Sequence, residues 1–331
     1  MSSRVAIIGC GVIGQKRAKA LGQATLVACA DLNMGRAETL AKSFPGVTAS
    51  SDIEGIITRP DVDVILAAAT HDALAKISMR AIQAGKHVLV EKPAARSIRE
   101  LDELIAVAEK GRVQVRVGFN HRYHPALQKA RALVRGGELG ELMFIRGRYG
   151  HGGRLGYEKE WRADPKLSGG GEMIDQGVHL IDLARWFLGD FSKVSGFAHT
   201  YFWKMPVEDN GFMMLRTAAQ QTAFLHVSCT EWKNLFSFEI YGKKAKLAIE
   251  GLGGSYGVER LFFYKMLPQM GPPEMTTWEY PQEDGSWNLE FEEFLEDIRL
   301  KRTPSANLTD ARAALAIVEK IGKESGYDHH A

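Results

Sequence analysis

The sequence is poor in cysteine, in long apolar runs and in net charge. Its 331 residues include three cysteines, Cys10, Cys29 and Cys229, which are too few and too scattered for a disulfide framework or a zinc cluster. We therefore expect small buried thiols and no metal centre. No apolar stretch approaches the ~18 residues that a membrane span needs. A formal net charge of +2 gives no reason to expect nucleic acid or a membrane surface as a partner.

The composition is that of an ordinary globular protein, with 45% hydrophobic and 25% charged residues, and the length suffices for two domains. The apolar run Val5-Ala-Ile-Ile8 is followed by glycines and is too short for a signal peptide. A cytoplasmic location is the expectation that follows.

Residues 4–119 alternate short apolar runs with helical patterns, which predicts a parallel sheet covered on both faces. This part is expected to form one domain, residues 1–120. The expected strands cover residues 4–8, 25–30, 62–68, 87–90 and 113–119, and the expected helices cover 14–21, 36–44, 73–84 and 97–110.

The rhythm changes after residue 120, where consecutive strands joined by short turns predict an antiparallel sheet in a second, α+β domain, residues 121–331. The proline-rich segment 268–281 is expected to be a surface loop. The expected strands cover 142–149, 193–199, 211–217, 222–230, 237–241, 246–250 and 260–264, and the expected helices cover 125–134, 172–188, 287–300 and 308–324.

A G-x-G-x-x-G motif, Gly9, Gly11 and Gly14, lies between the first strand and the first helix. The first glycine permits a tight turn, the second lets a pyrophosphate approach the backbone, and the third lets the helix pack on the strand. The backbone around Val12 and Ile13 then faces the phosphates. The motif predicts a dinucleotide site; the alternative is a flexible turn.

Asp31 ends the second strand, twenty residues after Gly11. A carboxylate at this position accepts hydrogen bonds from the adenosine ribose and repels a 2′-phosphate, so it favours NAD over NADP. Arg36 weakens this preference, and an Asp that only begins a loop is the alternative interpretation.

Lys92 follows the strand 87–90, at the edge where open parallel sheets bind ligands. A lysine that is partly desolvated beside a positively charged nicotinamide would have a lowered pKa and could serve proton transfer. A solvated surface lysine is the alternative.

Asp175 and His179 are four residues apart in a predicted helix, so they share one face. The imidazole can take an alcohol proton, and the carboxylate can hold the ring or stabilise its cation. A structural helical pair and two ligands of a metal site are the other readings, and Asp182 shares the same face.

The loop before this helix mixes cations, aromatic residues and glycines. Its aromatic rings can stack on a sugar and its arginines can bind phosphate or carboxylate, whereas a solvated loop is the alternative. The candidate substrate residues here are Arg148, Arg154, Tyr157, Trp161 and Arg162.

Taken in order, these motifs resemble the glucose–fructose oxidoreductase and inositol dehydrogenase (Gfo/Idh/MocA) family over nearly the whole chain. The resemblance is carried by Gly9–Gly14, the segment Ala84–Pro93, Gly118-Phe-Asn-His-Arg122 and Gly169–His179. It implies a Rossmann domain that binds the dinucleotide and a C-terminal domain with a large, mostly antiparallel sheet.

The resemblance also implies a catalytic set of Lys92, Asp175 and His179, with His179 as the general base. Lys92 would also hold substrate, and the Lys92-Pro93 bond is a candidate cis peptide. The family often has Thr-Pro-Asn-x-x-His after the fourth strand, and this chain lacks that proline and histidine. The resemblance further assigns Thr70, His71, Glu91 and Asn120 to the cofactor, and His121 and Arg122 to the substrate.

The function implied is NAD-dependent oxidation of a secondary alcohol of a sugar, cyclitol or sugar derivative to a ketone, or the reverse. A glycosidase of the same family that retains NAD, and a non-catalytic NAD-sensing or scaffold protein, are the alternatives. A homodimer or homotetramer through the C-terminal sheet is also expected, because apolar residues such as Phe224, Phe236 and Phe238 crowd its strands.

Overall fold

The computed structural model describes residues 2–328. Its contacts divide the chain into two compact units. The first comprises the residues up to Phe119, together with Lys166–Gly169 and Trp287–Leu315. The second comprises Asn120–Pro165, Gly170–Ser286 and the residues from Ala316 onward. No helix of the described residues is long and apolar enough to cross a membrane.

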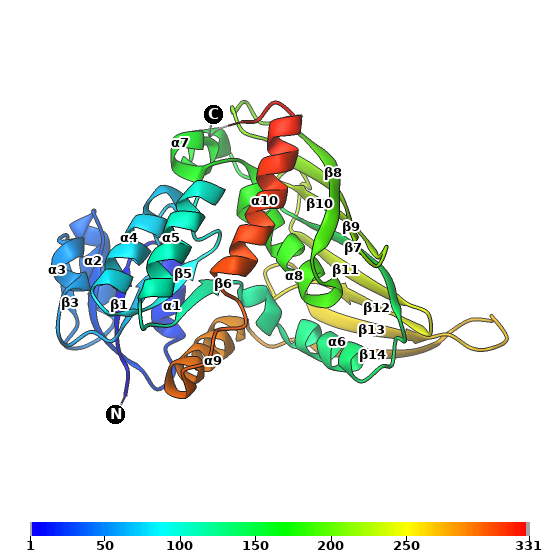
Figure 1. The fold of residues 1–331 in the computed structure, drawn as a ribbon, viewed down its shortest axis with the longest axis horizontal. Coiled ribbons are helices and arrows are strands. Elements are labelled where there is room, and N and C mark those ends of the chain that lie inside the picture. The colour runs from blue at the N-terminus through cyan, green and yellow to red at the C-terminus, as the bar shows by residue number, and fades with distance from the viewer. Residues whose placement is uncertain (1, 329–331) are drawn as a thin grey trace. The chain divides into compact units, whose positions relative to one another are not determined.

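The first unit contains a six-stranded sheet in the order β3-β2-β1-β4-β5-β6 (Figure 1). All neighbouring strands are parallel, as the alternation of apolar runs and helices predicted. The strands are β1 Arg4–Ile8, β2 Thr25–Ala30, β3 Thr48–Ser50, β4 Val64–Ala67, β5 His87–Glu91 and β6 Val115–Gly118. The helices are α1 Val12–Lys19, α2 Met34–Ala41, α3 Ile53–Ile57, α4 His71–Gln83 and α5 Ile98–Lys110. The short β3 and α3 were not predicted.

Helix α9, Ser286–Leu300, belongs to this unit from Trp287 onward although it lies far along the sequence. Its Phe291 and Phe294 are buried in one cluster with residues of β1 and β2. All three cysteines are free and buried, as expected.

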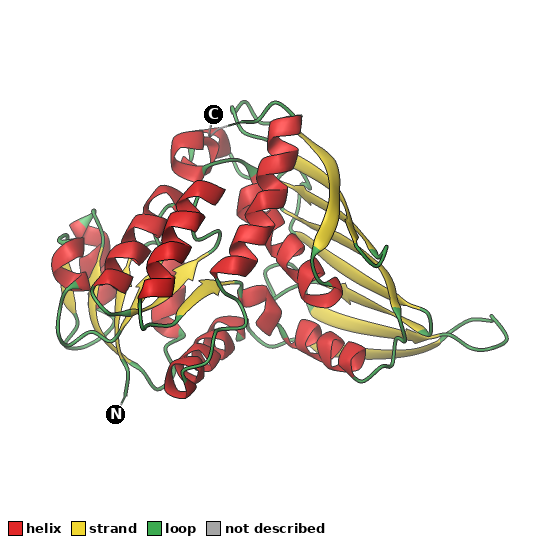
Figure 2. Cartoon of the chain, in the orientation of Figure 1, coloured by secondary structure: helices red, strands yellow, loops and turns green. Residues whose placement is uncertain are grey.

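The second unit contains an eight-stranded sheet in the order β14-β13-β12-β11-β7-β10-β9-β8. Every neighbouring pair is antiparallel except β7 with β10, which confirms the mostly antiparallel sheet. Helices α6 Pro125–Arg135 and α8 Val178–Leu188 lie along one face of it (Figure 2). The strands are β7 Leu142–Gly150, β8 Phe191–His199, β9 Asn210–Thr217, β10 Thr222–Ser228, β11 Leu235–Gly242, β12 Ala245–Glu250, β13 Glu259–Lys265 and β14 Glu274–Tyr280. The last helix, α10, spans Leu308–Glu324.

The two faces of this sheet differ in burial. Phe236, Phe238 and Ile240 of β11 are buried on one face. On the other face, Met214 of β9 lies opposite Phe224 of β10, and both side chains are exposed. The open face therefore carries apolar side chains that the second unit itself does not cover.

One prediction about local structure was wrong, and one correctly predicted helix has an unexpected start. Segment 268–281 is not wholly a loop, because β14 occupies Glu274–Tyr280 and pairs with β13. The prolines of this segment all lie outside Glu274–Tyr280, where β-branched and aromatic residues suit a strand. The predicted helix 172–188 begins with one π-helical turn, η4 Met173–Gly177, before α8.

Candidate active site

The glycine loop between β1 and α1 combines two closely packed glycines with one that is open on its Cβ side. Gly9 has φ +96°, and a Cβ built on it would lie 2.3 Å from the carbonyl oxygen of Ala68. A Cβ on Gly14 would lie 2.0 Å from the carbonyl oxygen of Gly9, whereas a Cβ on Gly11 would meet nothing within 4 Å. Close packing thus explains the first and third glycines, and open space beside the second fits a pyrophosphate. Val12, at the start of α1, is 72% exposed beside this space.

Asp31 is tied to the glycine loop. Its Oδ2 accepts a hydrogen bond of 2.8 Å from the Cys10 N–H, and its Oδ1 accepts one of 2.8 Å from the Asn33 N–H. The carboxylate therefore has a fixed place at the end of β2, which suits a group that reads the ribose hydroxyls. The bond to Cys10 was not foreseen from the sequence.

Hydrogen bonds hold Thr70 and His71 in the loop after β4. The Thr70 hydroxyl donates to Asp72 at 2.6 Å. His71 is buried, and its Nδ1 lies 2.8 Å from the carbonyl oxygen of Ser168 in the same unit. These contacts fix the two residues locally.

Lys92 directly follows β5 and is half-buried. The Lys92-Pro93 peptide is cis, as the resemblance implied. Glu91 is buried, and its carboxylate accepts a hydrogen bond of 2.6 Å from Nε of Arg17. The structure therefore pairs Glu91 with an arginine of the same unit.

In the second unit, His121 and His179 stack on each other. Their ring centroids are 3.8 Å apart with an interplanar angle of 18°, and both residues are buried. Tyr149 of β7 meets the edge of both rings, at 5.1 and 6.3 Å. Asn120 donates to Ser286 at 2.9 Å, and its Oδ1 lies 3.2 Å from Nδ1 of His121. The imidazole of His179 is thus flanked by His121 at its face and by Tyr149 at its edge.

Asp175 lies in the π-helical turn that precedes α8 and is buried. Nε of Arg162 donates to its Oδ2 at 2.7 Å. The nearby Asp175 carboxylate raises the pKa of the Arg162 guanidinium. The Arg162 guanidinium also lies 4.6 Å from the Trp161 ring centroid. The loop thus brings a cation and an aromatic ring to Asp175.

Tyr157 is buried in the same loop, with its ring centroid 5.5 Å from those of His151 and Trp203. Burial is the largest cause that lowers the pKa of His151, while Asp175 opposes the shift. The charge of the Asp175 carboxylate therefore affects the pKa of both His151 and Tyr157.

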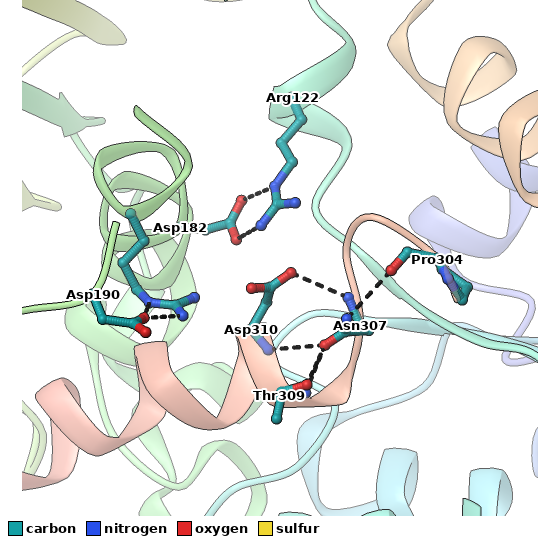
Figure 3. A network of polar contacts seen from close by, with 8 residues as sticks. Arg122, Asp182, Asp190, Pro304, Asn307, Thr309 and Asp310 are labelled. Atoms are coloured by element: carbon teal, nitrogen blue, oxygen red, sulfur yellow. Dashed lines mark hydrogen bonds and ion pairs between the residues drawn. The ribbon is translucent and has the colours of Figure 1, made fainter. Parts of the chain in front are cut away.

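Three of the arginines predicted to bind substrate are either paired with carboxylates or exposed. Arg122 is buried in an ion pair with Asp182, which Figure 3 shows face to face. Arg154 is exposed and pairs with Glu160 at 2.7 Å. Arg148 projects from β7 on the opposite face from Tyr149 and is exposed. Ion pairs engage Arg122 and Arg154, and Arg148 is exposed on the other face of β7, so the proposed substrate set does not include these three arginines.

Two groups near this helix were missed in the sequence. Tyr256 hydrogen-bonds to Tyr149, and burial raises the pKa of Tyr256 to about 12. Glu208, which precedes β9, accepts hydrogen bonds from the N–H groups of Gly171 and Met173 at 3.0 and 3.1 Å. Neither is near the motifs in sequence. The only signal for Glu208 is the glycine run 169–171, which indicates that another backbone approaches closely.

No group of three or more His, Cys, Asp or Glu side chains within residues 2–328 could hold a metal ion.

Comparisons with known proteins agree with this architecture. Residues 3–119 match the model of an oxidoreductase family with an NAD-binding Rossmann fold, Gfo/Idh/MocA, and residues 127–248 match its C-terminal domain model. Levoglucosan dehydrogenase of Pseudarthrobacter phenanthrenivorans is 32% identical over 199 residues, which cover 57% of this chain and 49% of that protein. Inositol 2-dehydrogenase 2 of Saccharopolyspora erythraea is 29% identical over 205 residues, 60% of this chain and 58% of that protein. The matched part therefore spans about half the length of these relatives.

Solved structures share the fold over the full length. Levoglucosan dehydrogenase in complex with NADH and L-sorbose has a TM-score of 0.87 at 24% identity and covers 98% of both chains. GenD2 from gentamicin A biosynthesis, in complex with NAD, has a TM-score of 0.84 at 21% identity and covers 98% of this chain and 94% of that one. Together, the two family models and the two sheets show that this chain belongs to the Gfo/Idh/MocA family of oxidoreductases.

Proposed function

We propose that the protein oxidises a secondary alcohol of a sugar, cyclitol or sugar derivative to a ketone with NAD, or runs the reverse reaction. The observation that carries this proposal is the pair of buried residues Asp175 and His179 in one helical segment, with the half-buried Arg162 bound to Asp175, in a chain whose glycine loop is open beside Gly11. The names of the relatives, which include dehydrogenases of levoglucosan and inositol, support a sugar-like substrate.

NAD, when bound at the open backbone beside Gly11, supplies the hydride acceptor. The chain itself must then remove the hydroxyl proton. His179 in its neutral form takes this proton at a ring nitrogen, and the stacked ring of His121 at 3.8 Å holds the imidazole in one plane. As an ammonium, Lys92 would lower the cost of the negative charge that develops on the reacting oxygen.

Asp175 has a different task. Its carboxylate is fixed by Arg162 at 2.7 Å, and its negative charge can support the imidazolium of His179. The half-buried Trp161 supplies the aromatic surface on which the apolar face of a ring sugar stacks, whereas Tyr157 is buried beside His151 and Trp203.

The proposal is tested by screening levoglucosan, myo-inositol, glucose 6-phosphate and nucleotide-linked sugars for NADH formation by absorbance. His179→Asn keeps the approximate shape of the side chain and removes the base. It should lower kcat by roughly 10²–10⁴-fold, the usual worth of a placed acid or base, with the Kd for NAD nearly unchanged. His199→Asn is a matched control because His199 is exposed on β8, and it should keep normal turnover. Near-normal turnover of His179→Asn would refute the assignment.

A further inference from the structure

A buried arginine lies one turn into the helix that follows the glycine loop. Arg17 of α1 is 1% exposed. Its Nε donates to Oε1 of Glu91 at 2.6 Å, and its Nη1 lies 2.6 Å from Oε2 of Glu290 on α9. The guanidinium also lies 4.5 Å from the ring centroid of Trp287. All these residues belong to the first unit, so one cation connects α1, the end of β5 and α9.

Glu91 is the residue before Lys92, and the backbone around the pair is tightly constrained. Ala94 donates its N–H to the carbonyl oxygen of Glu91 at 2.9 Å. Ala94 is buried and has φ +71°, a region that costs a non-glycine residue about 1 kcal/mol or more. A Cβ on Gly118 would lie 2.8 Å from Nη2 of Arg17 and 3.0 Å from Oε2 of Glu91. The ion pair thus lies directly over a glycine that leaves room for it.

The first unit offers a second buried arginine for comparison. Arg116 of β6 is 0% exposed and forms ion pairs with Asp297 and Glu293 of α9. Buried ion pairs add little net stability because desolvation offsets their attraction. Both arginines therefore serve mainly to fix geometry. Arg116 fixes α9 against β6, whereas Arg17 also fixes the residue that precedes Lys92.

We propose that Arg17 is a positioning residue that acts through the Glu91 carboxylate on Lys92, and that Glu91 serves this purpose rather than contact with the cofactor. The proposal rests on the proposed function, in which the Lys92 ammonium stabilises the negative charge that develops on the reacting oxygen. Because α1 begins at the glycine loop, the same arginine links the position of Lys92 to the helix that faces the cofactor phosphates.

The test is Glu91→Gln, which keeps the shape and removes the charge, made in the natural protein and in Lys92→Met. The assay uses the alcohol of the screen above that the natural protein oxidises fastest. Glu91→Gln should lower kcat roughly 10- to 100-fold, since a displacement of about 1 Å has that effect, and the Kd for NADH by fluorescence should change less than about threefold. In Lys92→Met the substitution Glu91→Gln should lower kcat less than about twofold, because the effects of substituting two residues that act as one unit do not add.

Asp297→Asn is the matched control, because it removes one carboxylate from the other buried arginine. It should lower the melting temperature at least as much as Glu91→Gln, and any effect on kcat should be the same factor in both backgrounds. Gly118→Ala is a second perturbation of the Arg17–Glu91 pair without a change of charge, and it should show the same dependence on Lys92.

Two results would overturn the positioning role alone: an equal kcat loss from Glu91→Gln in both backgrounds, or a loss of NADH affinity that accounts for the whole defect. Near-normal turnover of Lys92→Met by itself would instead overturn the role of Lys92 in the proposed function, and the positioning role with it.

Discussion

Gly171→Ala tests how the start of the helix that carries Asp175 and His179 is held. A Cβ on Gly171 would lie 2.0 Å from the carbonyl oxygen and 2.8 Å from the nitrogen of Glu208. Both are backbone atoms, so no side-chain rotation relieves the overlap. Gly171 has no positive φ, so the cost comes from this contact and not from backbone strain.

The size of the effect follows from the hydrogen bonds at the contact. An ordinary van der Waals contact begins at 3.4 Å, so the two backbones must separate by roughly 1 Å. The N–H groups of Gly171, Glu172 and Met173 all donate to Glu208, at 3.0 to 3.1 Å, and such a separation breaks them. Bonds to a buried charged acceptor contribute about 1.5–3 kcal/mol each and neutral ones about 1 kcal/mol. The expected loss is about 4–7 kcal/mol, or a fall in Tm of roughly 10 °C.

The neighbouring glycine provides the control. A Cβ on Gly170 would lie 3.2 Å from Cγ2 of Ile174, the end of a side chain that can shift, so Gly170→Ala should cost less than about 1 kcal/mol. Both variants gain the same stabilisation from reduced freedom of the unfolded chain. Urea and thermal denaturation at pH 8, with kcat on the same samples, make the comparison. The reasoning is refuted if Gly171→Ala melts within about 2 °C of Gly170→Ala.

Three further outcomes are expected. The natural protein should bind NAD more tightly than NADP, and Asp31→Ser should narrow the difference because it removes a charge that opposes the 2′-phosphate; equal affinities of the natural protein would contradict this, and isothermal titration measures both. Light scattering should give at least twice the mass of one chain, and Phe224→Arg should lower it, because Phe224 and Met214 are exposed on the open sheet face; a natural protein at the mass of one chain would argue against this interface. Burial raises the pKa of Glu208 to about 7, so the folded state holds an extra proton between the ordinary pKa of a glutamate and pH 7. The free energy of unfolding should therefore fall as pH rises through this window, and in Glu208→Gln this fall should be smaller by about 3 kcal/mol. If the free energies of unfolding of the natural protein and of Glu208→Gln differ by the same amount at pH 5 and pH 8, the prediction is contradicted.

The fold could be predicted from the sequence where each element carries its own signal. The apolar runs of β1 and β2 and the helical repeat of α10 gave these elements within the observed bounds. The prediction of a loop for segment 268–281 failed because its prolines flank β14 without entering it. A proline count over the whole segment hid the strand pattern of Glu274–Tyr280. The π-helical turn at Met173–Gly177 has no signal in the local sequence, which reads as an ordinary helix.

The candidate site was predictable in its motifs but not in its partners. The sequence placed Asp175 and His179 near each other because four residues separate them. It could not show that Arg162 would bind Asp175, that His121 would stack on His179, or that Arg122 would be used by Asp182. Arg148 and Tyr149 are adjacent in sequence, yet a strand sends them to opposite faces. An inventory of cations in a loop therefore cannot tell a substrate ligand from a surface charge.

The missed partners share a physical reason. Glu208 holds the turn of Asp175, and Arg17 holds the residue before Lys92, each from a distant part of the chain and each almost fully buried. A group that moves a proton must keep one polar atom available to its substrate, so hydrogen bonds to that atom cannot be what fixes it. Its rigidity therefore comes from the backbone that carries it. A buried charged group that forms two or three hydrogen bonds holds that backbone more firmly than apolar contacts do. Variants of these supporting groups should therefore alter kcat while the motif residues stay intact.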